Sequence, residues 1–411
     1  MRMKIYYKSF GCRVNQIELE SIIEKFLKKG HKLSFNDYEL LIVNSCCVTK
    51  KAEDDLLRFI RKEKEKNKFL KIILTGCYAT LFEENLKERF GDVVVYKNDE
   101  KKRIVKDFLN EEDDYFNVSG FNLRTRAFIK VQDGCNLRCS YCIVPFARNQ
   151  MISKPVENVI DEIKKLIENG YKEIVISGTR LGAYKSDDRK LKDLLKEIEK
   201  LNGDFRVRLS SLEPMEVDSE LVSIIKNSQR FCSYFHIPLQ SASDNILKDM
   251  KRNYSVKTFI EKIELIRKNI ENVGIYSDII VGYPSERDED FKETFKVTRN
   301  LKLSGLHIFT YSPRPFTKSF ELKDLNPKIK KERSKAMHEL DKKLRLEFAR
   351  SMIGKPLDSI SLNRKGEYTN FLTTNFIDVL VKENIPSGKR LNIKITEASE
   401  IQVKGEICQK I

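Results

Sequence analysis

The chain has few histidines and no long apolar run. Its four histidines are His31, His236, His307 and His338, which leaves little material for mixed cysteine–histidine zinc sites. No apolar segment approaches the roughly 18 residues that a membrane span needs, and the basic first residues lack the apolar core of a signal peptide. We therefore expect a soluble, cytoplasmic protein with no membrane contact.

Composition and length indicate a globular protein of several domains. The 411 residues are 40% hydrophobic and 34% charged, without a low-complexity tract, and this length suggests two to four domains. The nine cysteines are an odd number. In a chain of this size without a signal peptide, that favours metal or redox chemistry over a disulfide framework.

The chain is strongly basic. A net charge of +16 and an isoelectric point of about 9.2 favour a polyanionic partner. The alternative is a lysine-rich composition without functional meaning. Because the lysines are spread along the chain rather than clustered, charge by itself leaves both interpretations open.

The first part of the chain alternates apolar strands with amphipathic helices, which is typical of a parallel sheet with crossover connections. The predicted strands are Lys4–Lys8, Glu39–Val43, Lys71–Thr75 and Val93–Tyr96, and the predicted helices are Gln16–Lys28 and 51–66. Cys12, Cys46 and Cys77 follow three of these strands. Because binding sites of open parallel sheets form beyond the carboxyl ends of the strands, we expect these cysteines to meet in space.

A second series of strand–helix units follows an acidic, turn-rich segment, Asn110–Arg126, which is typical of a linker. Its predicted strands are Ala127–Gln132, Glu173–Ser177, Arg206–Ser210, Tyr234–Pro238, Ile275–Val281 and Gly305–Tyr311. Six such units suit an incomplete barrel better than a closed eight-stranded one.

The last part of the chain is predicted to be a small β-barrel. A charged helix from about Pro327 to Met352 ends at Gly354-Lys355-Pro356, and short alternating segments such as Phe376–Val381 and Arg390–Thr396 follow. We therefore expect an α/β protein with an N-terminal parallel α/β domain (1–115), a central partial (β/α)6 barrel (121–350) and a C-terminal small β-barrel (352–411).

Three cysteines stand in one short loop after the first predicted barrel strand. Cys135, Cys139 and Cys142 form a C-x₃-C-x₂-C triplet. A four-iron cluster usually takes four thiolates, so three would leave one iron open to a ligand that is not protein. The alternative is a zinc site or three structural thiols. A zinc knuckle usually needs a fourth Cys or His nearby, and Cys232 is remote in sequence.

The separated cysteines of the first domain are weaker evidence, because free cysteine is often simply buried. Their shared place at strand ends still favours a second iron–sulfur site. Cys47 stands beside Cys46, so either neighbour could be the ligand. We assign Cys232 and Cys408 to packing or to the surface.

Several predicted barrel strands end in polar or glycine-containing turns. The turns are Ser177–Gly182, Arg208–Pro214, Pro238–Ser241 and Asp278–Pro284. Each could be a plain turn, but all lie on the side of the barrel where the cysteine triplet is expected. We predict that Gly178 and Gln240 contact a cofactor there.

The predicted terminal barrel carries basic residues among apolar strands, namely Lys365, Lys382, Lys389, Arg390 and Lys394. Phosphate contacts and base stacking would give such a barrel affinity for nucleic acid. The alternative is a structural cap on the rest of the protein.

Four motifs resemble those of the methylthiotransferases in the radical S-adenosylmethionine superfamily, and the resemblance covers essentially the whole chain. They are Gly11-Cys12-Arg13-Val14-Asn15-Gln16, Asn44-Ser45-Cys46-Cys47-Val48-Thr49, Gly76-Cys77-Tyr78-Ala79 and the cysteine triplet. The second motif usually reads Asn-Thr-Cys-Ala-Val-Thr in the family, which implies that Cys46 is the ligand. Thr80 stands where the family usually has glutamine.

Within that family, the subclass that modifies N6-threonylcarbamoyladenosine at position 37 of tRNA looks most similar. Val14-Asn15-Gln16 and Arg208–Pro214 carry this likeness. The alternatives are the isopentenyladenosine subclass, a relative that modifies a protein side chain, and an RNA-binding iron–sulfur protein or redox sensor without catalysis.

The resemblance implies two [4Fe–4S] clusters and S-adenosylmethionine as cofactors. Cys135, Cys139 and Cys142 would hold the cluster that reductively cleaves S-adenosylmethionine to methionine and a 5′-deoxyadenosyl radical. The auxiliary cluster, on Cys12, Cys46 and Cys77, would carry the sulfur. The implied partners are the tRNA anticodon loop, gripped by a TRAM domain, and an electron donor such as flavodoxin or ferredoxin. The resemblance does not identify the sulfur donor.

Overall fold

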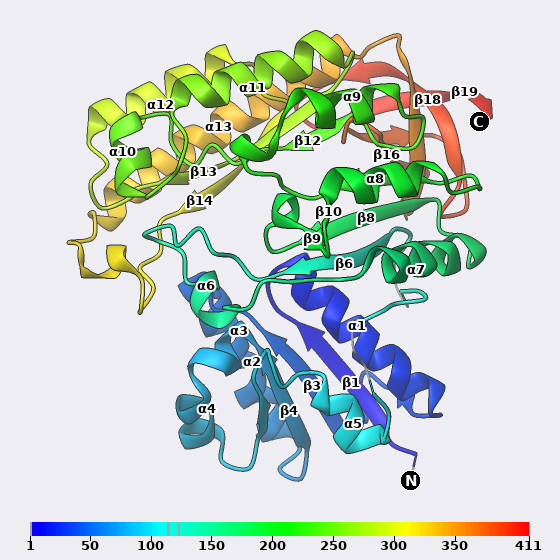
Figure 1. Ribbon diagram of the computed structural model, residues 1–411, viewed down its shortest axis with the longest axis vertical. Coiled ribbons are helices and arrows are strands. Elements are labelled where there is room, and N and C mark those ends of the chain that lie inside the picture. The colour runs from blue at the N-terminus through cyan, green and yellow to red at the C-terminus, as the bar shows by residue number, and fades with distance from the viewer. Residues whose placement is uncertain (1, 113–115, 122–123, 411) are drawn as a thin grey trace.

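The computed structural model describes residues 2–112, 116–121 and 124–410, and they form three bodies joined side by side (Figure 1). The N-terminal body holds a parallel sheet of strand order β2-β1-β3-β4-β5. Its strands are β1 (Lys4–Ser9), β2 (Lys32–Leu33), β3 (Leu40–Ser45), β4 (Lys71–Gly76) and β5 (Val94–Tyr96), and its helices are α1 (Arg13–Lys28), α2 (Lys50–Lys66), α3 (Cys77–Leu81), α4 (Glu83–Phe90) and α5 (Arg103–Leu109).

The four strands and two helices predicted for this body are all present. β3 is buried along its whole length, as expected for the middle strand of a sheet with helices on both faces. Strand β2 was not predicted, because two residues are too short to show alternation. The short helices α3 and α4 were missed as well, since neither is long enough for a clear helical period.

The segment predicted to be a linker is tied down wherever it is described. Val118 is buried, and its backbone N–H donates to Glu162 Oε1 at 2.7 Å. The N–H of Ser119 donates to Glu24 at 2.7 Å, so the segment contacts both α1 and the barrel. Part of the acidic run that suggested a linker, residues 113–115, lies outside the described residues.

The central body is an open barrel of six parallel strands, as predicted. One sheet has the order β11-β8-β6-β7 and the other β12-β13-β14, and a bridge from Val207 to Phe231 joins them. The strands are β6 (Ala127–Asp133), β8 (Glu173–Gly178), β11 (Arg206–Leu209), β12 (Tyr234–His236), β13 (Gly274–Val281) and β14 (Gly305–Thr310), with the short antiparallel β7 (Ile152–Ser153) at one edge and a separate hairpin of β9 (Lys185–Ser186) and β10 (Arg189–Lys190).

Helices cover the outer face of this barrel (Figure 1). They are α7 (Val156–Glu168), α8 (Leu191–Glu199), α9 (Ser219–Asn227), α11 (Val256–Asn269), α12 (Asp288–Asn300) and α13 (Pro327–Ser351). Two short helices lie elsewhere: α6 (Val144–Ala147) packs against α3 of the N-terminal body, and α10 (Asp244–Asp249) lies beside the cysteine triplet loop, where the Asp249 carbonyl accepts from the Ser140 hydroxyl. No helix in the described part of the chain combines the length and apolar character that crossing a bilayer requires.

The two faces of the barrel strands differ sharply in polarity. Outward-facing residues such as Ile174, Val207 and Ile275 join one apolar core with the covering helices. Because successive strand residues point to opposite faces, the alternate residues line the inner face. Glu173, Arg208 and other polar residues stand there, so the interior of the barrel is built to hold charge.

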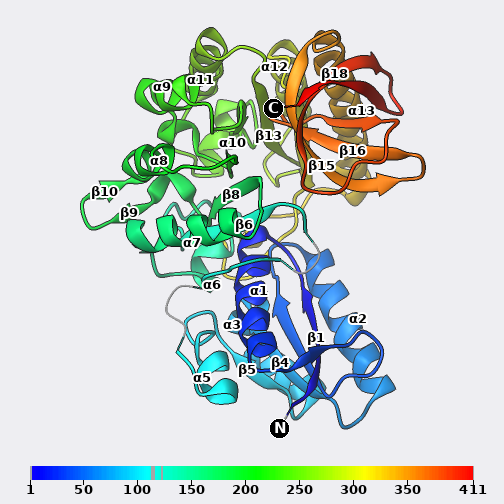
Figure 2. The same ribbon diagram turned by 90° about the vertical axis from the view of Figure 1, so that its right-hand side faces the viewer.

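The C-terminal body is a closed five-stranded barrel, which confirms the predicted small β-barrel. Its strands run in the order β15-β16-β17-β19-β18, and it sits beside α13 at the end of the open barrel (Figure 2). The strands are β15 (Pro356–Lys365), β16 (Tyr368–Thr373), β17 (Asp378–Val381), β18 (Arg390–Ala398) and β19 (Val403–Lys410).

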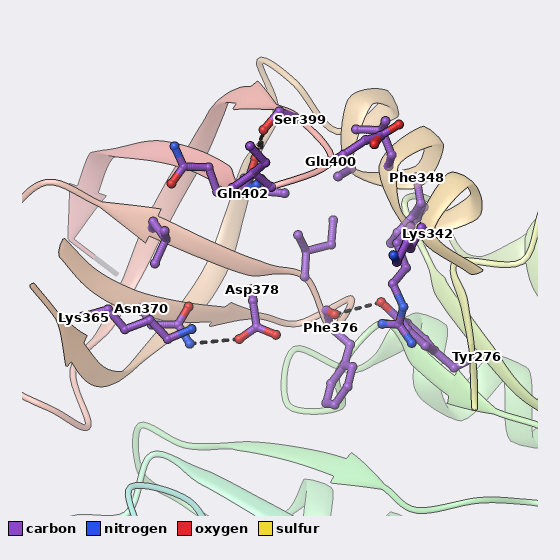
Figure 3. Close-up of a pocket in the computed structure, with 17 residues that line it drawn as sticks. Tyr276, Lys342, Phe348, Lys365, Asn370, Phe376, Asp378, Ser399, Glu400 and Gln402 are labelled. Carbon is purple, nitrogen blue, oxygen red and sulfur yellow. Dashed lines mark hydrogen bonds between the residues drawn. The ribbon is translucent and has the colours of Figure 1, made fainter. Parts of the chain in front are cut away.

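A cavity of about 280 Å³ lies between this small barrel and α13. Figure 3 shows Tyr276 and Phe376 meeting at its edge, where the Tyr276 hydroxyl donates to the Phe376 carbonyl at 2.8 Å. None of the predicted cofactor residues lines the cavity. It is a junction between two bodies, and none of the six predicted cluster cysteines lines it.

Two buried arginines connect the open barrel to the small barrel. Arg206 and Arg208 both donate to the carboxylate of Glu173, at 2.8 and 3.1 Å. Their remaining N–H groups donate to backbone carbonyls of the small barrel, including Leu372 and Thr374 at 2.8 Å. Burial raises the pKa of Glu173, but the charges of Arg208, Arg206 and Arg126 outweigh it and hold that pKa well below its usual value.

We expect Glu173→Gln to lower the stability of the folded protein by about 3 kcal/mol, because removing one partner of a buried ion pair leaves the other uncompensated. The urea midpoint followed by circular dichroism measures it. The control is Glu157→Gln, which breaks the exposed pair with Arg189 and should change the midpoint little. Equal midpoints for the two variants would contradict the assignment.

The same pair predicts an acid dependence. Since the folded pKa of Glu173 is depressed, its stabilisation is complete above the unfolded value of about 4.3. It is lost as the pH falls from there towards the folded pKa. The wild-type midpoint should therefore fall more steeply below about pH 4 than the midpoint of the Glu173→Gln variant.

Candidate functional site

The cysteine triplet lies in a loop directly after β6. Gly134 opens the loop with φ +81°, and a Cβ there would lie 2.0 Å from the carbonyl oxygen of Gln150, so only glycine fits this turn. The N–H of Cys142 donates to the carbonyl of Cys139 at 3.1 Å. The loop therefore folds back on itself, and Cys139 interacts electrostatically with both other thiols.

An ion pair supports this loop from the other side of the barrel. Arg252 donates to the sulfur of Cys139 at 3.1 Å and pairs with the carboxylate of Glu213, which follows β11. Burial raises the pKa of the Cys142 thiol to about 12. A buried thiol of this kind ionises when a cation supplies the compensating charge, and both a metal and a guanidinium do so.

The three cysteines of the N-terminal body also meet, although they are far apart in sequence. Cys12 precedes α1, Cys46 follows β3 and Cys77 begins α3. A Cβ built on Gly11, which has φ +92°, would lie 2.6 Å from the sulfur of Cys46. The chain before Cys12 thus passes directly over Cys46, at the carboxyl ends of the strands.

Gly76 sets the position of the third cysteine. It has φ +98°, and a Cβ there would lie 2.3 Å from Asn44 Oδ1. The glycine lets the chain turn from β4 straight into α3, with Cys77 as the first helical residue. Cys77 is fully enclosed, and Asn98 Nδ2 approaches its sulfur at 3.8 Å.

Cys46 and Cys47 face different surroundings. Cys46 interacts electrostatically with both Cys77 and Cys12. Cys47 lies in the apolar core with Leu41 and Leu74, and its thiol is hydrogen-bonded to Cys77. The arrangement therefore favours Cys46 as the third member of the set, with Cys47 as a neighbouring thiol.

A buried charge network joins the two cysteine sites. Arg148 donates to Glu18 Oε1 at 2.8 Å, to Asp133 Oδ1 at 2.7 Å and to Asn15 Oδ1 at 2.7 Å, and it also interacts with the thiol of Cys77. Asp133 stands two positions before Cys135. One guanidinium thus spans the distance between the auxiliary cysteines and the triplet loop.

Glu18, on α1, is the centre of this network. Besides Arg148 it pairs with Lys101 and with Lys130, the latter at 2.8 Å. Burial raises the pKa of Glu18, but the surrounding cations Arg148, Lys101 and Lys130 hold it well below its usual value. Since Lys130 lies on β6, the network fastens the N-terminal body to the barrel through an ionised carboxylate.

The two residues predicted to contact a cofactor both lie at the carboxyl ends of barrel strands. Gly178 is the last residue of β8, and a Cβ there would lie 3.0 Å from Gln132 Oε1. Gln240 follows β12 with φ +65°, and its carbonyl accepts from the N–H of Ile280 at 2.9 Å. Both share the face on which the triplet loop lies.

Sequence reasoning missed the charged residues that organise the site. Arg148, Glu18, Arg252 and Glu213 are distant from one another in sequence, and none stands in a spacing that predicts a contact. One sequence signal could have pointed to Glu18 as a buried charge: it stands between the apolar residues Ile17 and Leu19 on α1, and both of these are buried.

The basic residues of the small barrel are only partly free. Lys365 and Lys389 are exposed, and Lys382 and Lys394 form exposed pairs with Glu367 and Glu406, each at 3.5 Å. Arg390 pairs with Asp358 at 2.8 Å and with Asp204 at 2.9 Å. Arg390 therefore fastens the small barrel to the open barrel, and this corrects its predicted place among the residues available to a phosphate backbone.

The donor sets fit two iron–sulfur clusters. Each site gathers three thiols at the carboxyl ends of parallel strands, with an arginine beside one sulfur and no histidine or carboxylate in the set. Soft thiolate donors of this kind select iron–sulfur clusters or zinc. Three donors leave one coordination position for a ligand from outside the protein.

Comparisons with known families identify the two larger bodies. A model of the radical SAM superfamily matches residues 129–298. A second model, described as the uncharacterized protein family UPF0004, matches residues 4–96. The first match contains the cysteine triplet and the second contains the three separated cysteines.

Curated relatives cover nearly the whole chain. Threonylcarbamoyladenosine tRNA methylthiotransferase MtaB of Thermotoga maritima is 40% identical over 366 residues, 85% of this chain and 84% of the relative. The protein of the same name from Aquifex aeolicus is 34% identical over 96% of this chain and 100% of the relative. A tRNA-2-methylthio-N(6)-dimethylallyladenosine synthase of Endomicrobium trichonymphae is 30% identical over 98% of this chain and 100% of the relative.

Solved structures agree on the fold. The radical S-adenosylmethionine methyltransferase TsrM of Kitasatospora setae, with tryptophan and a cofactor analogue bound, has a TM-score of 0.57 at 12% identity and covers 88% of this chain and 79% of its own. The cobalamin-dependent radical enzyme OxsB has a TM-score of 0.51 and covers 77% of this chain and 54% of its own. At these identities the likeness concerns the fold alone.

We expect Cys46→Ala to remove about half of the iron from the anaerobically reconstituted protein, about eight atoms falling to about four. Cys47→Ala should leave the iron content unchanged, because Cys46 is the neighbour that interacts with both Cys12 and Cys77. Iron and sulfide analysis measures both. Iron loss in the Cys47 variant alone would reverse the assignment of the two neighbours.

Proposed function

This chain belongs to the threonylcarbamoyladenosine tRNA methylthiotransferase family, and we propose which of its residues carry out the methylthiolation. The family consists of radical SAM transferases with two iron–sulfur clusters and S-adenosylmethionine as cofactors. The product is 2-methylthio-N6-threonylcarbamoyladenosine at position 37 of tRNA. The observation that carries the proposal is the Arg148 guanidinium, which reaches from Cys77 to Asp133 and holds two three-cysteine sites together.

Cys135, Cys139 and Cys142 would hold the cluster that binds S-adenosylmethionine, and Cys12, Cys46 and Cys77 the auxiliary one. When bound, the first cluster would supply the electron that cleaves S-adenosylmethionine to methionine and a 5′-deoxyadenosyl radical, which takes the hydrogen from carbon 2 of the adenine. The second would supply the sulfur that replaces this hydrogen, with its methyl group from a second S-adenosylmethionine. Six thiolates in two sets account for the two clusters of the family.

The residues around the two sites orient the cysteines and the cofactor, and they shield the sites from water. Arg252, held by its ion pair with Glu213, donates a hydrogen bond to the Cys139 sulfur and so orients that side chain in the triplet loop. Gly178 and Gln240 would border S-adenosylmethionine at the strand ends. Cys77 and Cys139 are buried, which limits the access of water to both sites. Reactive intermediates require such exclusion of water.

Three phenylalanine rings, of Phe82, Phe146 and Phe316, form an aromatic cluster close to both cysteine sites. Phe316 lies 5.9 Å from Phe82 and 6.1 Å from Phe146, measured between ring centroids. Phe82 follows Cys77 closely and Phe146 follows Cys142 closely in sequence, and Phe146 and Phe316 are about half exposed. The unstacked bases of an anticodon loop bind well to such rings.

The small barrel would serve as a TRAM domain spanning residues 352–411, after a first domain of residues 1–115 and a radical domain of residues 121–350. Its exposed Lys382 and Lys389 would contact tRNA phosphates. The electron donor would be a flavodoxin or ferredoxin, and the place of action the cytoplasm.

The reaction is tested with anaerobically reconstituted protein, S-adenosylmethionine, a reductant and an anticodon stem-loop that carries threonylcarbamoyladenosine. We expect a nucleoside heavier by one methylthio group, seen by mass spectrometry, and its absence in a Cys135/Cys139/Cys142 triple alanine variant. Iron analysis of that variant should give about four atoms in place of about eight. A product formed only from isopentenyladenosine RNA would replace the substrate named here.

We expect tRNA affinity to fall by more than about tenfold for a fourfold rise in salt, as several phosphate contacts require. Lys389→Ala should reduce the slope of log affinity against log salt by about 0.7. Lys68→Ala, which removes an exposed charge far from the small barrel, is the matched control. An unchanged slope in the Lys389 variant would show that the small barrel does not contact the RNA backbone there.

A further inference from the structure

The inner face of the open barrel carries a second set of polar groups above the Glu173 ion pairs. It comprises Ser177, Ser210, His236, Asp278 and His307, here called the inner polar layer. Ser177 and Ser210 lie two positions beyond Val175 and Arg208, which are paired across β8 and β11. Asp278 is paired with His307 across β13 and β14. These side chains therefore lie at similar heights, near the carboxyl ends of the strands.

One aspartate organises the histidines of this layer. Asp278 Oδ1 lies 2.7 Å from His236 Nε2 and 3.2 Å from His307 Nδ1. Burial raises the pKa of Asp278, but the two histidines outweigh it and keep that pKa well below its usual value. Each imidazole therefore donates to an ionised carboxylate and has one ring nitrogen left.

Those remaining nitrogens are open to a ligand. Among the described residues, neither His236 Nδ1 nor His307 Nε2 has a hydrogen-bond partner. The side chains of His236, Asp278 and His307 are 15%, 19% and 39% exposed, so solvent reaches them inside the barrel. A neutral imidazole offers an acceptor at the remaining nitrogen, suited to an N–H or O–H of a guest.

The two serines of the layer have buried hydroxyls without partners in the described structure. Ser177 is only 2% exposed. An unsatisfied buried polar group costs about 1 to 3 kcal/mol, and such groups are rare in folded proteins. Two of them in one layer, beside two solvent-accessible imidazole nitrogens, indicate a place where a polar guest completes the hydrogen bonds.

Arg13 adds an unpaired positive charge to the same interior. It is the first residue of α1 and follows Cys12 directly. Its guanidinium carbon lies 5.7 Å from the ring centroid of Phe128, an inner-face residue of β6, and it interacts with the hydroxyl of Tyr234. Within the described residues its guanidinium has no ion-pair partner, whereas Arg206 and Arg208 are fully paired.

We propose that the inner polar layer and Arg13 bind the threonylcarbamoyl group of the substrate adenosine, with Arg13 pairing with its carboxylate. This inference rests on the proposed function and adds the residues that select the substrate. The threonylcarbamoyl group carries one carboxylate, one hydroxyl and two N–H groups. The site offers one unpaired guanidinium, two hydroxyls and two ring nitrogens, which is a complementary set.

The same groups disfavour an apolar substituent. A dimethylallyl group would fill the space without forming any of these hydrogen bonds, and it would leave the partly buried Arg13 guanidinium without an ion-pair partner. Sites built to hydrogen-bond a substrate reject analogues that lack the polar group by about 10⁴-fold or more. Selection against isopentenyladenosine would therefore come from the inner face of the barrel.

The position of Arg13 links recognition to reaction. Because it follows Cys12, which belongs to the auxiliary set, a carboxylate held by its guanidinium lies close to the site that delivers sulfur. The layer stands near the strand ends, where S-adenosylmethionine would bind. A threonylcarbamoyl group bound between Arg13 and the inner polar layer would fix the adenine ring relative to the auxiliary cysteines and to S-adenosylmethionine.

The test compares two synthetic anticodon stem-loops, one with threonylcarbamoyladenosine and one with its carboxylate converted to the neutral methyl ester. For the wild-type protein, the ester should react with a kcat/KM lower by about 30-fold or more, mainly through KM, as loss of a buried charge pair implies. For Arg13→Gln the acid and the ester should react alike, at the level of the wild type with ester.

Two controls accompany this comparison. Arg124→Gln removes an exposed guanidinium that approaches the same Phe128 ring and should preserve the preference for the acid. Iron content of the Arg13 variant should stay at about eight. If Arg13→Gln lowers kcat/KM for the acid and for the ester by the same factor, the preference for the acid remains and the proposed pairing is wrong. If the wild-type protein fails on both stem-loops, the proposed function itself fails.

A second variant separates guest binding from cofactor binding and folding. Ser210→Ala removes a buried hydroxyl without a partner in the fold, so the urea midpoint should stay the same or rise while KM for the acid stem-loop rises several-fold. A raised KM for S-adenosylmethionine instead would assign the layer to the cofactor. Binding of one zinc ion per protein that is lost in His307→Asn would assign it to a metal, since the ligand atoms lie within 4.8 Å of one another.

Discussion

The ionised carboxylate of Glu18 is the constraint on which the rest of the molecule depends. It is buried at the boundary of two bodies and receives three cations from three separate segments of the chain. A buried charge of this kind is tolerated only with good hydrogen-bonded partners, so α1, β6 and the segment after α6 have one relative placement that satisfies it. That placement brings Cys77 and the triplet loop to the two ends of the Arg148 guanidinium.

Much of the fold follows from the sequence, since its signals are local. Alternating runs such as Lys71–Thr75 and Tyr234–Pro238 mark buried strands, and a cysteine after the strand end marks the site. The parallel topology then requires that Cys12, Cys46 and Cys77 meet, because strand ends share one edge of a sheet. Short elements such as β2 and α3 carry too few residues for any period to be visible.

The electrostatic part of the site could not be predicted in the same way. Arg148, Glu18 and Arg252 are charged residues among 138 that look alike in sequence, 77 basic and 61 acidic. Only the folded chain shows which of them are buried and which partners they share. Arg390 shows the converse. From the sequence it was expected to be available to RNA, but in the structure it forms ion pairs with Asp358 and Asp204.

The small barrel is not a detachable module. Its backbone carbonyls at Leu372, Thr373 and Thr374 accept hydrogen bonds from the two arginines inside the open barrel. They therefore close one end of the open barrel. The small barrel cannot shift without disturbing the buried ion pairs of Glu173 with Arg206 and Arg208. Domain shuffling in evolution would have to exchange the two barrels together.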